Sequence, residues 1–425
     1  MGKRIVITTI GSLGDLHPFI ALALALKKAG HAPVLAIQEN YLEKAKAAGL
    51  EAYSIMPSFT YLAQNMGMDE KVFVKRIMSD IDFMFSKILL PGLKSYTAEL
   101  DKIVKGADAV LGSPFVFAGD IVAEKYGIPF IAGVLQPALI STVYDPIYSP
   151  QIKILKSKPE NNLGVLWNTL VFTAIKAASR ARYGKHINAV RTEFGLPRSK
   201  SAPYLAPEKT PLTLALYSPV MGGLQPDFFP NTQITGFPVF DSFSGTPETL
   251  DDALLDFFKA GPAPLVFTLG SLAVHAAEDF YQTSRRVAQD LGQRAILLTG
   301  LDGEIETSRT IAIRKYAPHS LIFPHCKALI HHGGIGTTGQ ALMAGKPQLV
   351  VPHLGDQWDN GARIKRLGVG GVLDAKKYSL RAAKDNIMSL IGDENMSVKA
   401  ASIGEIVRYE NGLEAAVTAI QTLFE

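Results

Sequence analysis

The sequence predicts an α/β protein with two domains, each built around a parallel sheet. The 425 residues exceed the size at which one hydrophobic core stops growing, so two domains of roughly 200 residues each are expected. A composition that is 47% hydrophobic and 19% charged supports large buried cores and excludes global disorder. Short β-branched runs alternate with helical segments, an order typical of parallel strands connected by helices. We therefore divide the chain into an N-terminal domain at 1–218, a linker region at 219–247 and a C-terminal domain at 248–425.

The N-terminal domain begins with the run Arg4 to Thr9, which predicts a strand that ends in a glycine-containing loop. A strongly apolar helix is expected from about Pro18 to Ala29, because proline in the first turn loses no helical hydrogen bond. The later elements of this domain are expected as strands at 31–37, 109–112 and 129–134 and a helix at 115–126.

Turn-forming residues between Pro219 and Pro247 indicate the linker. The C-terminal domain then repeats the alternation of strands and helices. Its strands are expected at 265–269, 295–299, 321–322, 328–330 and 348–351. A last helix at about 412–424 could pack on either domain.

The densest cluster of chemistry-bearing residues runs from His331 to Gly339, between an expected strand and an expected helix. Its glycines allow backbone N–H groups to approach phosphate oxygens, and the helix N-terminus adds a partial positive charge. The side chains of His332 and Thr337 could donate to the same anion. The literal G-x-G-x-x-G at Gly334, Gly336 and Gly339 makes a dehydrogenase an alternative. Its late position in the domain and the preceding histidine pair disfavour that alternative.

A carboxylate and an amide follow the next expected strand, at Asp356 and Gln357. Such a pair can bind vicinal sugar hydroxyls, because the carboxylate accepts hydrogen bonds and the amide both accepts and donates them. An anion-binding loop and a carboxylate–amide pair about twenty residues apart predict a nucleotide sugar lying across a parallel sheet.

The segment from Tyr316 to Asn360 resembles the donor-binding signature of the family-1 UDP/dTDP-dependent glycosyltransferases, whose GT-B fold has two Rossmann-like domains facing across a cleft. The chain is most similar to the bacterial branch with the rhamnosyltransferases and the sterol and antibiotic glycosyltransferases. The similarity extends over most of the chain and includes 11–18 and 267–271. Three motifs are particularly like the rhamnosyltransferases, at 186–191, 235–238 and 356–360.

The resemblance implies that the C-terminal domain binds the donor and the N-terminal domain binds the acceptor. Tyr316 would stack on the pyrimidine, and Asp356 and Gln357 would hold the sugar. The diphosphate would be held by Ser271, His332, Gly334, Gly336 and Thr337. A plant glutamate that binds the ribose hydroxyls is replaced by Gln340, which permits dTDP and, with the rhamnosyltransferase-like motifs, favours dTDP-rhamnose over UDP-glucose.

An inverting transfer needs a base near the acceptor hydroxyl. The plant catalytic histidine matches Asp15 here, and its assisting aspartate matches Ser113, so the plant dyad is absent. We expect Asp15 to be the base. The alternative is that His17 is the base, or that it orients Asp15, and Asp15 could at the same time cap the following helix.

The acceptor is expected to be apolar, such as a flavonoid, another phenol or a hydroxy fatty acid. Residues 55–90 are rich in Met and Phe, which can repack around varied apolar ligands, although plain helix core explains each of them equally well. The candidate acceptor-binding residues are Phe59, Met84, Phe85 and Tyr144.

Composition limits the partners and cofactors. A net charge of +4 without a dense basic run gives no indication of nucleic-acid binding, and the single cysteine, Cys326, is typical of the reducing cytoplasm. The apolar stretch Leu163 to Ala178 is too polar to span a membrane. It is either a core or acceptor-site helix or, less simply, a membrane-surface helix that would give peripheral membrane contact.

No metal or cofactor beyond the nucleotide sugar is expected. The D-x-D at Asp80 and Asp82 falls in a helical segment, where residues at i and i+2 point apart, and the helix dipole and histidine can neutralise a diphosphate. Two other classes remain as alternatives to transfer: a nucleotide-sugar epimerase and a non-catalytic sugar-nucleotide-binding protein.

Overall fold

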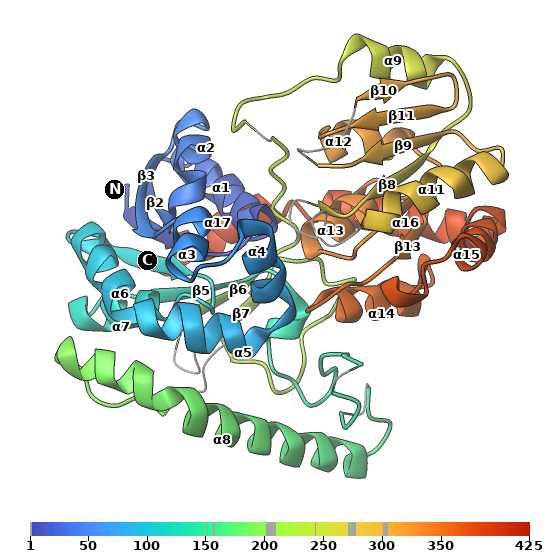
Figure 1. Cartoon of the computed structure of the whole chain (residues 1–425). Helices are drawn as coiled ribbons and strands as arrows, with labels where there is room; N and C mark the ends of the chain where they lie inside the picture. Colours follow the sequence, from blue (N-terminus) through green and yellow to red (C-terminus); the bar gives the residue numbers. More distant parts are fainter. Residues whose placement is uncertain are drawn as a thin grey trace. The chain divides into compact units, whose positions relative to one another are not determined.

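The computed structural model describes residues 2–150, 152–155, 158–200, 210–242, 244–270, 278–300 and 305–425. The chain forms two compact units. Unit 1 comprises Met1–Phe240 and Asn411–Glu425, and unit 2 comprises Asp241–Glu410. The predicted α/β class is confirmed in both units, each of which has a seven-stranded sheet covered by helices (Figure 1).

The sheet of unit 1 has the strand order β3-β2-β1-β4-β5-β6-β7, and all its pairings are parallel. Its strands are β1 (Arg4–Thr8), β2 (Ala32–Gln38), β3 (Glu51–Met56), β4 (Ala109–Gly112), β5 (Phe130–Val134), β6 (Leu212–Ala215) and β7 (Thr232–Ile234). Its helices are α1 (Leu13–Lys28), α2 (Leu42–Ala47), α3 (Phe59–Asn65), α4 (Glu70–Ser79), α5 (Ile81–Phe83), α6 (Leu90–Val104), α7 (Phe117–Tyr126), α8 (Asn162–Glu193) and α17 (Gly412–Thr422). A π-helical segment, Met84–Leu89, joins α5 to α6.

Helix α1 begins five residues earlier than its proline predicts. Ser12 is the N-cap, and its side chain and backbone form a capping box with Asp15, so the helix starts at Leu13. Pro18 therefore lies inside the helix, and the prediction of a start at Pro18 was wrong. The capping box decides the start because it satisfies the first N–H groups, which a proline cannot do.

The final helix, α17, packs against α1 within unit 1. Its first residue, Gly412, lies so close to Gly236 that a Cβ atom would come within 2.7 Å of the Gly236 carbonyl carbon. Gly236 itself has φ +109°, a conformation that favours glycine. The glycine of the 235–238 motif therefore serves the packing of the last helix.

Unit 2 has the strand order β10-β11-β9-β8-β12-β13-β14, which is parallel except for the edge strand β10. Its strands are β8 (Leu265–Thr268), β9 (Ala295–Leu298), β10 (Glu306–Thr307), β11 (Ile311–Arg314), β12 (Ala328–His331), β13 (Gln348–Val350) and β14 (Gly370–Val372). Its described helices are α9 (Asp252–Lys259), α11 (Glu278–Asp290), α12 (His319–Ile322), α13 (Ile335–Met343), α14 (Gln357–Leu367), α15 (Leu380–Gly392) and α16 (Glu394–Tyr409). The expected strand at 321–322 is instead the end of α12.

The core of unit 2 occupies both faces of its sheet. Leu265 and Phe267 of β8 pack in one apolar cluster, while Val266 packs in the other. Successive side chains of a strand point to opposite faces, so a strand covered on both faces must be apolar throughout. Among the described residues, no helix combines the length and hydropathy that a membrane crossing requires.

Candidate active site

A glycine-rich loop follows β12 near the middle of the unit 2 sheet. His331, the last residue of β12, is fully buried, and its Nε2 lies 2.9 Å from Gln348 Oε1. The backbone N–H of Gly333 donates to His331 Nδ1 at 3.1 Å, so the proton is on Nε2. Burial lowers the pKa of His331 to about 4. His331 is thus a neutral side chain that fixes the turn of the loop.

His332 fits between two glycines. A Cβ atom at Gly270 would lie 2.7 Å from His332 Cε1, and one at Gly334 would lie 2.4 Å from Nε2. The imidazole is 9% exposed, and its buried Nδ1 has no partner among the described residues. A buried nitrogen without a partner needs an explanation, and a ligand at this loop supplies one. Burial, reinforced by the neighbouring imidazoles of His331, His353 and His319, lowers the pKa of His332 well below its ordinary value.

The N-terminus of α13 offers space beside His332. Gly334 is its N-cap, and a Cβ atom added at Gly336 would meet nothing within 4 Å. Thr337 is 8% exposed in the same first turn. Open space at backbone N–H groups that have no helical partner is the geometry of an anion site.

Asn360 of α14 joins this loop to Asp356. Its Nδ2 donates to the carbonyl oxygen of Gly333 at 2.9 Å and to Asp356 Oδ2 at 2.8 Å. Asp356 is the N-cap of α14 and is partly exposed. The carboxylate and the anion-binding loop, predicted to act together, are therefore held in one hydrogen-bonded arrangement. Asn360 was not among the predicted site residues, although its i+4 spacing from Asp356 on a helix could have indicated it.

Gln357 has a second task besides the predicted sugar contact. Its side chain is 3% exposed, and its Oε1 accepts hydrogen bonds from the backbone N–H groups of His353 and Leu354 at 2.8 and 3.2 Å. The carbonyl oxygen thus holds the turn before α14. The amide NH2 group remains the part of Gln357 best suited to a sugar hydroxyl.

The predicted base-binding residue, Tyr316, is half-buried. Its hydroxyl donates to Asp241 Oδ1 at 3.1 Å, and the backbone N–H of Ser320 donates to Asp241 Oδ2 at 2.5 Å. Burial raises the pKa of the Tyr316 hydroxyl. Gln340 in α13 has a buried Oε1 without a partner among the described residues. Ser271 lies outside the described residues.

The candidate base, Asp15, lies in the first turn of α1 in unit 1. Its Oδ2 accepts hydrogen bonds from the backbone N–H and the hydroxyl of Ser12 at 2.7 and 2.9 Å. Desolvation by burial raises the pKa of Asp15 in spite of these bonds. Gly11 makes room for the carboxylate, because a Cβ atom there would lie 2.4 Å from Asp15 Oδ2. Tyr41 donates to the carbonyl oxygen of Gly11 at 3.1 Å and fixes the loop from the other side.

His17 contacts a cation. Its Nε2 lies 2.8 Å from Nζ of Lys44, and its ring meets Phe240 edge-on at 5.3 Å. An ammonium group only donates, so Nε2 of His17 accepts and its proton lies on Nδ1. The lone pair on Nε2, which His17 would need to act as a base, therefore accepts a hydrogen bond from Lys44.

An apolar pocket of about 280 Å³, its open mouth included, lies in unit 1 beside the end of β1. It is lined by Ile10, Ile55, Met56, Leu89, Leu93, Tyr96 and the segment 115–118. Ile10 directly precedes Gly11 and Ser12, which lead into the first turn of α1 and its Asp15, so the pocket and the candidate base share one segment of chain. Sequence reasoning missed most of this lining, which comes from four separate segments.

The predicted acceptor residues have different positions. Phe85 is fully buried and packs on Phe115 and Phe117, which line the pocket, so it supports the pocket from behind and has no exposed surface of its own. This corrects its assignment as a residue in direct contact with the acceptor. Phe59 and Met84 are partly exposed, and Tyr144 is 36% exposed; none of these three lines the pocket.

Comparison with known proteins decides the family. Residues 5–144 match the glycosyltransferase family 28 N-terminal domain, and residues 304–408 match the erythromycin biosynthesis protein CIII-like C-terminal domain. The chain belongs to the GT-B glycosyltransferases. The same matches support the predicted enzyme class, a nucleotide-sugar-dependent hexosyltransferase.

Its relatives include enzymes that are named for different activities. The chain is 28% identical to the O-mycaminosyltylonolide 6-deoxyallosyltransferase of Streptomyces fradiae, over 98% of this chain and 97% of that protein. It is 27% identical to a sterol 3-beta-glucosyltransferase of Emericella nidulans over 98% of this chain, but it spans only 30% of the length of that relative. Among solved structures, the spinosyn rhamnosyltransferase SpnG complexed with thymidine diphosphate has a TM-score of 0.67 at 16% identity, over 100% of both chains.

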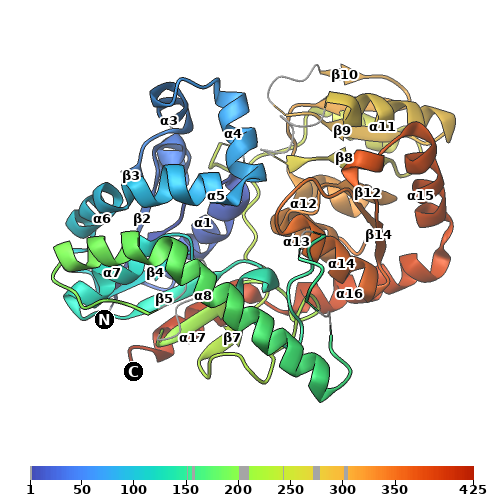
Figure 2. The same ribbon diagram turned by 60° about the horizontal axis from the view of Figure 1, so that its bottom comes forward.

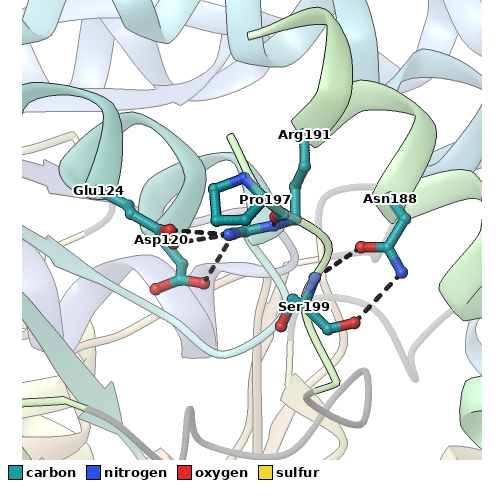
Figure 3. A network of polar contacts seen from close by, with 6 residues as sticks. All are labelled: Asp120, Glu124, Asn188, Arg191, Pro197 and Ser199. Carbon is teal, nitrogen blue, oxygen red and sulfur yellow. Dashed lines mark hydrogen bonds and ion pairs between the residues drawn. The ribbon is translucent and has the colours of Figure 1, made fainter. Parts of the chain in front are cut away.

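The rhamnosyltransferase-like motif at 186–191 is structural in this glycosyltransferase (Figure 3). Arg191 of α8 is 4% exposed, and its Nη2 donates to both carboxylate oxygens of Glu124 of α7, at 2.8 and 2.9 Å. It also donates to the carbonyl oxygen of Pro197 at 2.8 Å. Asn188 exchanges hydrogen bonds with the backbone of Ser199 at 2.7 and 3.2 Å. Through these contacts, the motif holds the chain that follows α8 in place.

The D-x-D of the glycosyltransferase is structural as well. Asp80 caps α5, and Asp82 accepts hydrogen bonds from Arg182 and from Tyr183 at 2.7 Å. Within the described parts of the chain, no three His, Cys, Asp or Glu side chains are grouped as a metal site would require. Metal independence stays a prediction, because the grouping of side chains does not show whether the reaction uses a metal ion.

Proposed function

We propose that this glycosyltransferase transfers a hexose, with inversion and without a metal ion, from a nucleotide sugar to a hydroxyl group of an apolar acceptor. The observation that carries the proposal is the hydrogen-bonded unit of the His332 loop, Asn360 and Asp356. In this unit, the N-terminus of α13 can bind a diphosphate, and the carboxylate of Asp356 can bind a sugar. The side-chain amide of Asn360 is hydrogen-bonded to both parts of the unit.

Asp15 is the base in this proposal. Its Oδ2 is held by Ser12, while Oδ1 takes part in no hydrogen bond among the described residues. Burial raises its pKa, which brings its proton affinity closer to that of a useful base. His17 is less suitable, because its Nε2 already accepts from Lys44. Lys44 then adds positive charge on this side of α1, and His17 orients the ammonium group of Lys44 without taking the proton.

The proposed reaction is one displacement at the anomeric carbon. The acceptor hydroxyl gives its proton to Asp15 as its oxygen forms the new C–O bond. The bond between the anomeric carbon and the phosphate oxygen breaks on the opposite face, and the nucleoside diphosphate leaves with that electron pair. The α13 N-terminus and Thr337 stabilise the negative charge that develops on the leaving group.

The donor is proposed to be dTDP-rhamnose. The amide of Gln340 has an unpaired buried Oε1 where a carboxylate would favour the ribose 2′-hydroxyl of UDP. Some structural relatives were solved with thymidine diphosphate. UDP-glucose is the second candidate, and the sterol 3-beta-glucosyltransferases among the relatives favour it.

The acceptor is proposed to be a flavonoid or another phenol, with a hydroxy fatty acid as the alternative. The pocket beside β1 supports an apolar molecule, because its lining is aliphatic and aromatic apart from the hydroxyl of Tyr96. The buried cysteine, Cys326, fits the cytoplasm as the compartment of this reaction.

The test is to incubate the purified protein with a flavonol and either dTDP-rhamnose or UDP-glucose, without added metal, and to identify products by mass spectrometry. A deoxyhexose gained only with dTDP-rhamnose supports the proposed donor, and a hexose gained only with UDP-glucose supports the second candidate. Consumption of donor without transfer would indicate an epimerase. The Asp15→Asn variant should bind nucleotide normally and lose about 10²–10⁴-fold in transfer rate. If it keeps most of its activity, Asp15 is not the base, and His17→Ala becomes the decisive variant.

A further inference from the structure

Helix α8 buries several polar residues beside Val171 and Val190 on its inner face and exposes several large apolar residues on its outer face. On the side facing unit 1, Asn168 is fully buried and donates to the carbonyl oxygen of Val143 at 2.9 Å. Farther along the same side, Tyr183 donates to Asp82 at 2.7 Å, and Arg191 pairs with Glu124. Polar side chains thus make up part of an inner face that is usually apolar in a surface helix. Figures 1 and 2 show α8 as an outer helix of unit 1.

The outer face of α8 carries an apolar stripe. Leu163, Leu166, Trp167 and Leu170 are 77%, 55%, 43% and 58% exposed, at the i, i+3, i+4, i+7 spacing of one helix face. Exposed alanines extend the stripe at the same spacing, at 174, 177, 178 and 181. From Leu163 to Ala181 the stripe is about 27 Å long at the rise of an α-helix. Four large exposed side chains in one row are more than the scattered apolar residues of an ordinary surface.

Positive charge surrounds the stripe. The only acidic residue of α8 is its last, Glu193, and the exposed Arg180 and Lys185 lie in its second half. Exposed Lys153 and Lys158 precede the helix, and the exposed Glu160 lies between them and its first residue. Basic side chains therefore outnumber acidic ones at both ends of the stripe, and α8 itself has no acidic side chain beside the stripe.

We propose that the outer face of α8, with this stripe and its basic flanks, docks on the surface of an anionic lipid bilayer. The helix would lie in the plane of the interface, with the leucines among the acyl chains and the basic groups at the headgroups. A second copy of this chain fits less well, because two identical basic faces repel each other. Trp167, whose Nε1 donates to the carbonyl oxygen of Ile154 at 2.7 Å, presents the amphipathic ring typical of membrane interfaces. The proposal rests on α8 alone and does not require the proposed reaction.

Vesicle binding tests the proposal directly. The full chain is sedimented with vesicles of phosphatidylglycerol and phosphatidylcholine, and with vesicles of phosphatidylcholine alone, at low and high salt. We expect binding to the anionic vesicles that weakens with salt, and much weaker binding to the neutral ones. Quenching by brominated lipid should be lost in Trp167→Phe, which identifies the ring that enters the interface.

Three variants separate the contributions of the stripe and the charges. L166S/L170S should weaken binding at least about tenfold, because two leucines lose their burial. R180E/K185E should weaken it at least about 25-fold, at about fivefold per basic residue removed. The control is V398S on α16, which removes an equally exposed apolar side chain (70%) and should change nothing.

Several outcomes would overturn the proposal that α8 docks on an anionic bilayer. The wild type could fail to bind anionic vesicles, or the control could lose as much binding as the α8 variants. Sedimentation that shows a dimer dissociated by L166S/L170S would assign the stripe to a second copy instead. Activity on a water-soluble acceptor should be the same in all variants, so failure of this inference and failure of the proposed reaction give different results.

Discussion

Replacing Gly336 by alanine should raise the stability of this protein and weaken its affinity for the nucleotide. The added Cβ atom meets nothing within 4 Å, so no protein group has to move. Alanine in place of a helical glycine contributes about 0.5–1 kcal/mol, or an unfolding midpoint higher by about 1–4 °C for a unit of this size. In the proposed donor site, the same methyl group would stand where a phosphate oxygen approaches the N-terminus of α13. Loss of one charge-assisted hydrogen bond costs about 1.5–3 kcal/mol, which corresponds to an affinity roughly 10- to 100-fold lower.

This prediction is specific because stability and nucleotide affinity are expected to change in opposite directions. A variant that is simply damaged loses both stability and affinity. Thermal unfolding and calorimetric titration with dTDP and UDP measure the two quantities. The matched control is Gly184→Ala in α8, where a Cβ atom also meets nothing within 4 Å; it should gain similar stability and keep its affinity. Gly334→Ala should lose stability, because its Cβ atom would lie 2.4 Å from His332 Nε2. An unchanged dissociation constant in Gly336→Ala would refute the anion site at α13.

Three other changes test the remaining parts of the site. Asn360→Ala removes the amide between Gly333 and Asp356, so we expect about 1–3 kcal/mol less stability and a higher donor KM; an unchanged KM would contradict the role of this link. Because the base must be ionised, the raised pKa of Asp15 means that kcat/KM falls with decreasing pH through a pKa above the ordinary aspartate value. Asp15→Asn should lack this fall on the acid side of the pH profile. A fall that persists in the variant would assign the titration to another group. Arg191→Met should cost about 1–3 kcal/mol in thermal unfolding with donor and acceptor KM unchanged, and a changed donor KM would count against its purely structural role.

Much of the fold was predictable because strands that are buried on both faces leave long apolar runs. β8 and β12 are such strands, and their alternation with helices indicated the parallel sheets. The segment 321–322 was misassigned because two apolar residues fit a short strand and a short helix equally well. The start of α1 was misplaced because proline was given more weight than the capping box of Ser12 and Asp15.

The chemical types at the site were easier to predict than their connections. The loop at His332 and the carboxylate of Asp356 were predicted to act together from their spacing, and the structure connects them through Asn360. The amide that joins them, Asn360, and the engagement of His17 by Lys44 depend on side-chain directions, which spacing does not determine. The apolar pocket likewise collects residues from four segments, and only folding brings Ile10, Leu93 and Phe117 together.

The glycines of the two loops answer different physical demands, which explains why a literal dinucleotide fingerprint occurs in a glycosyltransferase. Gly11 leaves space for the carboxylate of Asp15, and Gly334 leaves space for the imidazole of His332, each at 2.4 Å from a hypothetical Cβ atom. Gly336 is different, because a Cβ atom there would meet nothing within 4 Å, and the proposed diphosphate would give this position a reason to lack a side chain. In a dinucleotide-binding loop, the glycines bring the backbone close to a pyrophosphate and to the neighbouring strand. Here one of these positions, Gly334, leaves space for the side chain of His332. The pattern of glycines therefore indicates a tight loop, and the side chains that the glycines accommodate indicate its chemistry.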